Sequence, residues 1–346
     1  MDTAVNWTAG LWCQPLSRSA SSQKNPLGFR TASRNTIEAK VDLVIPLKVS
    51  ILCFPLYVRS LILFKSNLTL RAGMCPSSGD GKEESKEWLK IFTRPIKERL
   101  NAAAPGADLK NKDVHRLMSL CIYLSEANMA PSPFCGLFDA EEFKDYEYYE
   151  DLRKFYSFGY AWSFFLTLDF SSSDVYSHGG CLGRVQGVGY VNELIARLTG
   201  QPVRDNTQTN RTLDSSPETF PLNRTFYADF THGSGLTSIY SALGLFQQHL
   251  LPGQKLDPTN PSPLRTWIVS NMNPFSARMV VERLECEGVP GLPLPKGTFV
   301  RILVNEAIQP LEFCGGVGGL CELNAFVESQ WYARHDGDGD FEKCYD

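Results

Sequence analysis

The chain has little net charge. Its 346 residues carry 34 lysines and arginines against 38 aspartates and glutamates, which leaves a formal charge of −4 at neutral pH. Proteins that bind nucleic acid or anionic membranes concentrate positive charge, so neither partner is favoured. Histidine is scarce, with five residues, and no Cys-x-x-Cys pair indicates zinc or thioredoxin-like chemistry. Electrostatic effects on function are therefore expected at a local site.

Long apolar runs are also missing. The strongest run, VSILCFPLYVRSLILF at residues 49–64, is interrupted by Pro55 and Arg59 and is shorter than a membrane span requires. The first residues, MDTAVNWTAGLWCQPLSRSASSQK, lack the basic start and apolar core of a signal peptide. We therefore predict no membrane association, and the sequence shows no leader for secretion.

Cysteine, in contrast, is plentiful, with ten residues. Four Asn-X-Ser/Thr sequons accompany the cysteines, at Asn6, Asn67, Asn210 and Asn223. Both features favour an oxidising, secretory environment, whereas the first residues show no signal-peptide pattern. The spacings Cys121/Cys135 and Cys314/Cys321 suit short disulfide loops, with free buried thiols as the alternative.

Residues 75–200 predict a helical domain. Apolar residues recur at helical spacing in four segments, at residues 82–105, 108–127, 140–160 and 186–200. Pro95 predicts a kink or a break in the first segment, and Asp108 or Asn111 is available to cap the second. Gly200 is expected to end the fourth helix in the left-handed conformation.

Residues 201–346 alternate between strand and helix patterns. The patterns predict, in chain order, a strand at 225–231, a helix at 236–246, a strand at 265–270, a helix at 274–286 and a hairpin at 298–313. Alternating strands and helices are typical of an α/β layer. The predicted architecture is an α/β domain beside a helical domain, preceded by a degenerate segment, residues 1–74, with one buried strand at 41–46.

Two motifs resemble ligand sites but lack essential parts. Asp336, Asp338 and Asp340 alternate like calcium ligands, yet Phe341 stands where an EF-hand needs glycine and the bidentate glutamate is missing. The glycines of CGGVGGLC, residues 314–321, lack the Gly-Lys-Ser/Thr ending of a phosphate loop. We expect no metal site and no cofactor.

His232 is the histidine with the strongest case for function. It follows the predicted strand at 225–231 and precedes a predicted helix, and such positions bind anions in α/β proteins. From this pattern alone, a structural histidine explains the position equally well. His115 and His249 are interpreted more simply as solvated or packing residues.

Five stretches closely resemble the fungal phytases of the histidine acid phosphatase family. They are LSEANMAPSPFCGLF, QGVGYVNELIARLTGQPVRDNTQTNRTLDSSPETFPLNRTFYADFTH, SIYSALGL, VRILVNEAIQPLEFC and, from Cys321 to Cys344, CELNAFVESQWYARHDGDGDFEKC. The resemblance implies a histidine-phosphatase-like α/β domain, incomplete at its N-terminus, with a helical domain and a phosphate pocket between them. It also implies a secreted, monomeric acid phosphatase that hydrolyses phytate or other small phosphomonoesters.

The resemblance further implies three disulfides, Cys75–Cys344, Cys121–Cys135 and Cys314–Cys321. Cys286 matches a family cysteine whose partner lies in a region that this sequence does not show, so we expect a free thiol. Cys13, Cys53 and Cys181 have no family counterpart. Glycosylation is expected at Asn67, Asn210 and Asn223.

Two catalytic elements of the family are missing. An Arg-His-Gly-x-Arg-x-Pro motif supplies the family's nucleophilic histidine and its phosphate-binding arginines, and no Arg-His-Gly occurs in this sequence. A His-Asp pair follows the family's strand: His232 matches the phosphate-binding histidine, but Gly233 replaces the aspartic acid that protonates the leaving alkoxide. Removing a general acid typically costs about 10²–10⁴ in rate.

We therefore expect an impaired or inactive phytase-type phosphatase, with a non-catalytic phosphate-binding or structural glycoprotein as the alternative. Lys154 matches a family lysine that contacts the phosphates of phytate, although a solvated helix lysine is the plainer interpretation.

Two insertions, residues 49–64 and 161–180, interrupt the resemblance. We hypothesise that both are translated introns, and that the first would loop out and expose an apolar patch.

Overall fold

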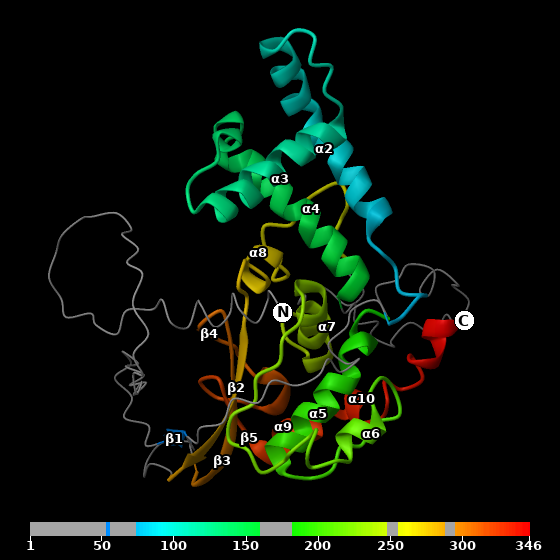
Figure 1. The fold of residues 1–346 in the computed structure, drawn as a ribbon, viewed down its shortest axis with the longest axis vertical. Helices are drawn as coiled ribbons and strands as arrows, with labels where there is room; N and C mark the ends of the chain where they lie inside the picture. The colour runs from blue at the N-terminus through cyan, green and yellow to red at the C-terminus, as the bar shows by residue number, and fades with distance from the viewer. Residues whose placement is uncertain (1–52, 56–73, 160–181, 248–254, 288–294) are drawn as a thin grey trace, which may run out of the picture.

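The computed structural model describes residues 53–55, 74–159, 182–247, 255–287 and 295–346, with the backbone alone for residues 53–55. The predicted strand at 41–46, His249, Asn67 and nearly all of both insertions lie outside the described residues. Helices α2, α3 and α4 gather at one end of the molecule, and the sheet lies towards the other (Figure 1).

Three helices form the first part of the described chain: α2 (Lys82–Ala103), α3 (Asn111–Asn128) and α4 (Ala140–Phe158). All three confirm the predicted helical segments. Helix α2 is not split at Pro95, because Phe92 and Ile96 are buried on either side of it and hold the helix against its neighbours. Lys110 is the N-cap of α3, so the predicted caps are wrong; the Asp113 carboxylate accepts a bond from the Lys110 amide instead.

Shorter helices make up most of the remainder. They are η2 (Pro133–Leu137), η4 (Arg184–Gly187), α5 (Val188–Thr199), α6 (Arg211–Asp214), α7 (Gly233–Leu243), α8 (Val269–Met272), η5 (Glu312–Cys314), α9 (Leu323–Ser329), α10 (Trp331–Arg334) and η6 (Glu342–Tyr345). Helices α5 and α7 confirm their predictions, and Gly200 ends α5 in the left-handed region at φ 70°. Because α5 packs on α7 and α10, a domain division at residue 200 stays a prediction.

The sheet is antiparallel throughout its described strands. Its strands are β1 (Cys53–Pro55), β2 (Met279–Cys286), β3 (Gly297–Val304), β4 (Ala307–Ile308) and β5 (Leu320–Glu322), in the order β1-β2-β3-β4 with β5 also on β3. The β3–β4 pair confirms the predicted hairpin. Strand β1 pairs with β2, so part of the 49–64 segment joins the sheet rather than looping out, because the edge of β2 offers it backbone partners.

Three predicted elements are wrong. Residues 274–286 contain strand β2 rather than a helix, because all eight residues from Met279 to Cys286 pair with β3 and residues 274–278 form a turn before it. The Glu282 carboxylate accepts a bond from Arg301 Nε, at 2.5 Å, across that pair. Residues 225–231 and 265–270 are not strands either; side-chain bonds hold the first segment, and the second leads into α8.

The three long helices α2 to α4 and the later part of the chain share one continuous hydrophobic core. It joins Phe155 and Tyr148 of α4, Tyr240 of α7, Trp267 and Phe326, each at most 1% exposed. A smaller cluster of Leu284, Cys286, Phe299 and Leu320 lies on the sheet. Within the described residues, no helix is both long enough and apolar enough to cross a membrane.

The three predicted disulfides are confirmed: Cys75–Cys344, Cys121–Cys135 and Cys314–Cys321. The prediction of a free thiol at Cys286 is wrong, because Cys286 is disulfide-bonded too. Its side chain is buried at the end of β2, where the register places the Cα of Cys53 opposite it. The resemblance could not predict this bond, because it assigns Cys286 a partner in a region that this sequence does not show.

Candidate active site

His232 lies directly before helix α7 and is its N-cap residue. Its backbone is extended, with φ −96° and ψ 162°, its side chain is exposed, and it makes no side-chain cap bond. No acidic residue lies in the first turn of α7. The amide groups of the first turn lack intrahelical acceptors, and the helix dipole is positive there. The start of α7 therefore offers an exposed histidine beside a helix end suited to anions.

The segment before His232 is anchored to α5 by a buried ion pair. Arg197 Nη1 donates to Asp229 Oδ2 at 2.5 Å, and the Tyr190 hydroxyl donates to the same oxygen at 3.3 Å. The Arg197 guanidinium also lies 4.9 Å and 5.1 Å from the ring centroids of Phe220 and Tyr227. These contacts hold residues 220–230 in place, as pairing with a neighbouring strand would have done.

A close helix contact fixes α7 itself. A Cβ added at Gly187 would collide with the backbone carbonyl oxygen of Ser238 in α7. Only glycine allows the turn that begins α5 to approach the α7 backbone this closely. The position of His232 is thus set from both sides, by the ion pair before it and by the packing of α7 after it.

Lys154 reaches the same helix start from α4. Its ammonium Nζ lies 2.7 Å from Ser234 Oγ and 5.3 Å from the ring centroid of Phe158. Burial lowers the pKa of Lys154, against the opposing effect of the nearby Glu150 carboxylate. The structure therefore brings two of the predicted site residues, His232 and Lys154, to the first turn of one helix.

Gly233 keeps room for a side chain. It is the first residue of α7, its φ lies outside the left-handed region, and an added Cβ would meet only Asn273 Cβ and Cγ, at 3.8 Å. Asn273 Nδ2 donates to Thr237 Oγ1, while Asn273 Oδ1 is buried and has no hydrogen-bond partner among the described residues. The structure therefore leaves room for a side chain at position 233.

Sequence reasoning missed two members of this site. Ser234 stands two residues after His232, and its place in the letters HGSG was a signal that could have been used. Asn273 follows α8, and nothing local marks it, because only contacts distant in sequence, such as its bond to Thr237 of α7, bring it near Gly233.

The other sequence motifs serve structural contacts. Asp336 accepts bonds from the backbone and side-chain nitrogens of Asn206, at 2.8 Å and 2.6 Å, and Asp340 accepts one from the Tyr332 hydroxyl at 2.9 Å. In the described part of the chain no three His, Cys, Asp or Glu residues converge on a possible metal position. His115 stacks on Tyr146, with ring centroids 5.0 Å apart.

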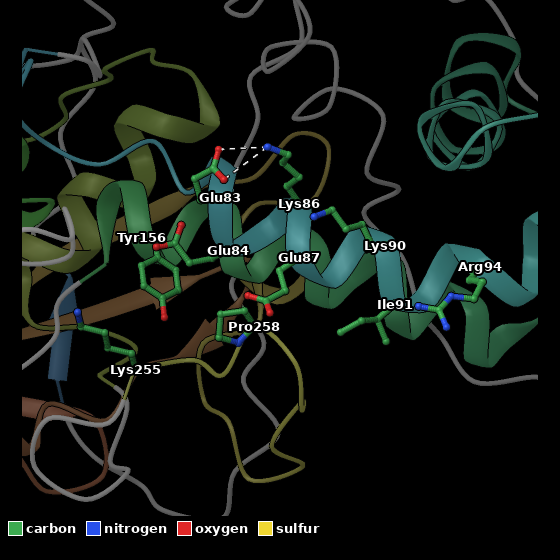
Figure 2. A pocket seen from close by; sticks show the side chains of 10 residues that line it. All are labelled: Glu83, Glu84, Lys86, Glu87, Lys90, Ile91, Arg94, Tyr156, Lys255 and Pro258. Atoms are coloured by element: carbon green, nitrogen blue, oxygen red, sulfur yellow. Dashed lines mark hydrogen bonds and ion pairs between the residues drawn. The ribbon is translucent and has the colours of Figure 1, made fainter.

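A surface cavity of about 760 Å³ lies elsewhere. Figure 2 shows side chains of α2, among them Glu84, Lys90 and Arg94, on one side of it and Lys255 and Pro258 on the other. His232, Gly233 and Lys154 are not among the lining residues. Its mixed charges give no preference for anions, so this cavity is a separate feature from the start of α7.

Helices packed beside an antiparallel sheet, with an exposed histidine at the start of α7, place the molecule in the α/β class. The chain matches the family model "Histidine phosphatase superfamily (branch 2)" over residues 1–305. It belongs to that family, which confirms the resemblance seen in the sequence.

Curated relatives support the assignment. The chain is 39% identical over 262 residues to Phytase A of Arthroderma benhamiae, covering 73% of this chain and 52% of the relative. It is 36% identical over 279 residues to Phytase A of Aspergillus oryzae, covering 78% and 54%. The chain therefore spans about half the length of these relatives.

A solved phytase structure from D. castellii has the same fold. Its TM-score is 0.53 at 22% identity, and the match covers 77% of this chain and 47% of that one. At this identity the likeness concerns the fold alone.

Proposed function

We propose that the chain is a phytase-type acid phosphatase in scaffold and phosphate binding, with little or no turnover as written. The carrying observation is the start of α7, where His232 is the exposed N-cap residue and Lys154 contacts Ser234 two residues later. The resemblance places Gly233 where the family has its acid. The curated relatives carry the name Phytase A, which makes phytate the first substrate to test.

Phosphate binding follows from the charges at this helix start. The Lys154 ammonium supplies positive charge, the His232 ring can donate an N–H to a phosphate oxygen, and the amides of the first turn add further donors. Phytate carries several phosphate groups, so one can lie at His232 while a neighbouring one meets Lys154. The two side chains approach from two different elements, His232 from the start of α7 and Lys154 from α4.

Chemistry is the weak part of the site. An alkoxide is a poor leaving group unless an acid protonates it, and Gly233 has no proton to give. The Arg-His-Gly nucleophile motif does not occur in the 346 residues either, so the covalent route has no histidine to start it. We infer binding without efficient hydrolysis.

The setting that we propose is extracellular, with the protein as a glycosylated monomer. The three described disulfides fit an oxidising compartment. Asn210 and Asn223 are both exposed, which leaves their sequons open to glycosylation.

Two measurements test the proposal. Phosphate release from phytate at acidic pH should be far below the turnover of an ordinary enzyme, about 10 s⁻¹. Calorimetric titration should show phytate binding that weakens in Lys154→Ala and is unchanged in Lys90→Ala, an exposed lysine of α2. Ordinary turnover would refute the loss of catalysis. Absence of binding would favour the alternative, a structural glycoprotein on the phosphatase scaffold.

A further inference from the structure

Lys154 has an unusual partner for a lysine. Its Nζ lies 2.7 Å from the hydroxyl oxygen of Ser234, a neutral group. Other lysines with described side-chain bonds, such as Lys110, Lys144 and Lys296, pair with carboxylates. A carboxylate partner would favour the charged ammonium, which a serine hydroxyl does only weakly.

The surroundings favour the neutral amine. Lys154 is half-buried between α4 and the start of α7, and burial disfavours its charged form. The positive end of the α7 dipole acts in the same direction, as does Arg153. Glu150 opposes them, yet it is itself engaged by Arg153 at 3.3 Å and lies 3.8 Å from His115. The balance lowers the pKa of Lys154, and burial is the largest cause.

Ser234 is placed as a nucleophile would be. It lies in the first turn of α7, half-exposed, between Gly233 and Gly235, neither of which has a side chain to screen it. The backbone amides of this turn have no intrahelical acceptors, so a negative oxygen formed beside Ser234 meets N–H donors at the positive end of the helix. Serine–lysine pairs perform acyl transfer on other folds with the same division of roles.

We propose that Ser234 and Lys154 form a serine–lysine nucleophile pair that reacts with carboxylic esters, an activity separate from phosphate chemistry. In the neutral state the Lys154 lone pair accepts the Ser234 proton across the existing contact. Ser234 Oγ then bonds to the ester carbonyl carbon, and the carbon–oxygen bond to the alcohol breaks. The alcohol leaves with the proton held by Lys154, and water hydrolyses the acyl-serine by the reverse transfers.

The two uses of Lys154 require opposite charge states. Phosphate binding needs the ammonium and weakens as pH rises, whereas activation of Ser234 needs the free amine and strengthens as pH rises. The charges that act on Lys154 are those of Glu150 and Arg153, and α7 presents it with a neutral hydroxyl. The opposite pH trends make the two roles separable in one protein.

The test is covalent labelling of the full chain with a fluorophosphonate probe, which forms a phosphorus–oxygen bond to an activated serine and releases fluoride. Mass spectrometry of peptides should place the label on Ser234 and not on Ser238 of the same helix. The labelling rate should rise with pH, because burial lowers the pKa of Lys154 and the free amine therefore forms at lower pH than in an ordinary lysine.

Variants decide which residue activates the serine. Ser234→Ala should remove the label, and Lys154→Arg, which keeps the charge but cannot serve as a base, should slow it by about 10² or more. Lys90→Arg on α2 is the matched control and should label at the normal rate. Circular dichroism checks that each variant is folded. Lys154→Met is a second variant that removes the amine and should also slow labelling. An unlabelled wild-type protein, or labelling in Lys154→Arg at the normal rate, would refute the pair.

Phytate titration of the same variants separates this inference from the proposed function. Lys154→Arg should keep phytate affinity while losing the label. Intact phytate binding without any label on Ser234 overturns the nucleophile pair alone. A labelled Ser234 in a protein without phytate affinity supports the pair and overturns the phosphate-binding proposal.

Discussion

The guanidinium of Arg197 and the carboxylate of Asp229 form an ion pair with 9% and 15% of their side chains exposed. Arg197 belongs to the last turn of α5, and Asp229 lies three residues before His232. The pair therefore ties the segment before His232 to the well-packed helix α5, and so helps to fix the position of the histidine. Its energetic value can be measured directly.

Breaking this pair from one side should be costly. Arg197→Ala leaves the Asp229 carboxylate buried without its counter-ion, and such changes typically cost about 3–5 kcal/mol. Urea unfolding followed by circular dichroism measures the loss. Lys86→Ala, which removes the exposed partner of Glu83, is the control and should cost under about 1 kcal/mol. Equal losses in the two variants would show that Arg197 does not anchor the segment.

Position 233 should accept an aspartate. In Gly233→Asp the new Cβ has room, and a carboxylate in the first turn of a helix is favourable by about 0.3–1 kcal/mol. Thermal unfolding should give a Tm equal to or above that of the parent protein. Gly187→Ala is the contrast, because its Cβ would collide with the Ser238 carbonyl and lower the Tm. A fall in the Tm of Gly233→Asp as large as that of Gly187→Ala would contradict the conclusion that position 233 has room for a side chain.

Asp151 should make the protein more stable in acid than at neutral pH. Its carboxylate is fully buried, and burial raises its pKa from an ordinary value of 3.8 to about 7, against bonds from Val269 N and Arg265 Nε, both 2.7 Å long. The folded state therefore holds a proton that the unfolded state releases between about pH 4 and pH 7. The free energy of unfolding falls as pH rises through this window.

Unfolding experiments across that range test the assignment. Asp151→Asn should flatten the fall, because the amide does not titrate. Asp108→Asn, at an exposed carboxylate whose pKa is lowered, should leave it unchanged. A slope that survives in Asp151→Asn would assign the pH dependence to another group.

The hypothesis of translated introns makes a prediction about the transcript. Mature mRNA should lack the codons for residues 49–64 and 161–180, and sequencing it is sufficient. The pairing of β1 with β2 is the observation that weighs most against the hypothesis for the first insertion. In-frame retention of both segments would end it.

Helices were predictable where one face is buried and the other is not. Trp88, Phe92 and Ile96 repeat at helical spacing, and all three are buried in α2. Strand β2 was missed because its glutamates and arginine favour a helix in isolation. Contacts with β3, such as those of Glu282 with Arg301 and of Glu285 with Thr298, stabilise them in a strand. Tertiary contacts outweighed local preference there.

The site was half visible in the sequence. His232, Gly233 and Lys154 could be found because the family resemblance marks their positions. The contact between Lys154 and Ser234 joins residues 80 positions apart, and that of Asn273 with Thr237 joins residues 36 apart. No local pattern encodes such contacts, since they depend on how α4, α7 and α8 pack.

The bond between Cys75 and Cys344 has a consequence for engineering. It holds the two Cα atoms 4.6 Å apart across a separation of 269 residues. The Tyr345 hydroxyl also donates to the Met74 carbonyl oxygen, at 3.0 Å. Residues 75–344 therefore form a closed covalent ring, so a short peptide joining these two positions would allow circular permutation, with new termini opened in a distant surface connection while His232 and Lys154 keep their places.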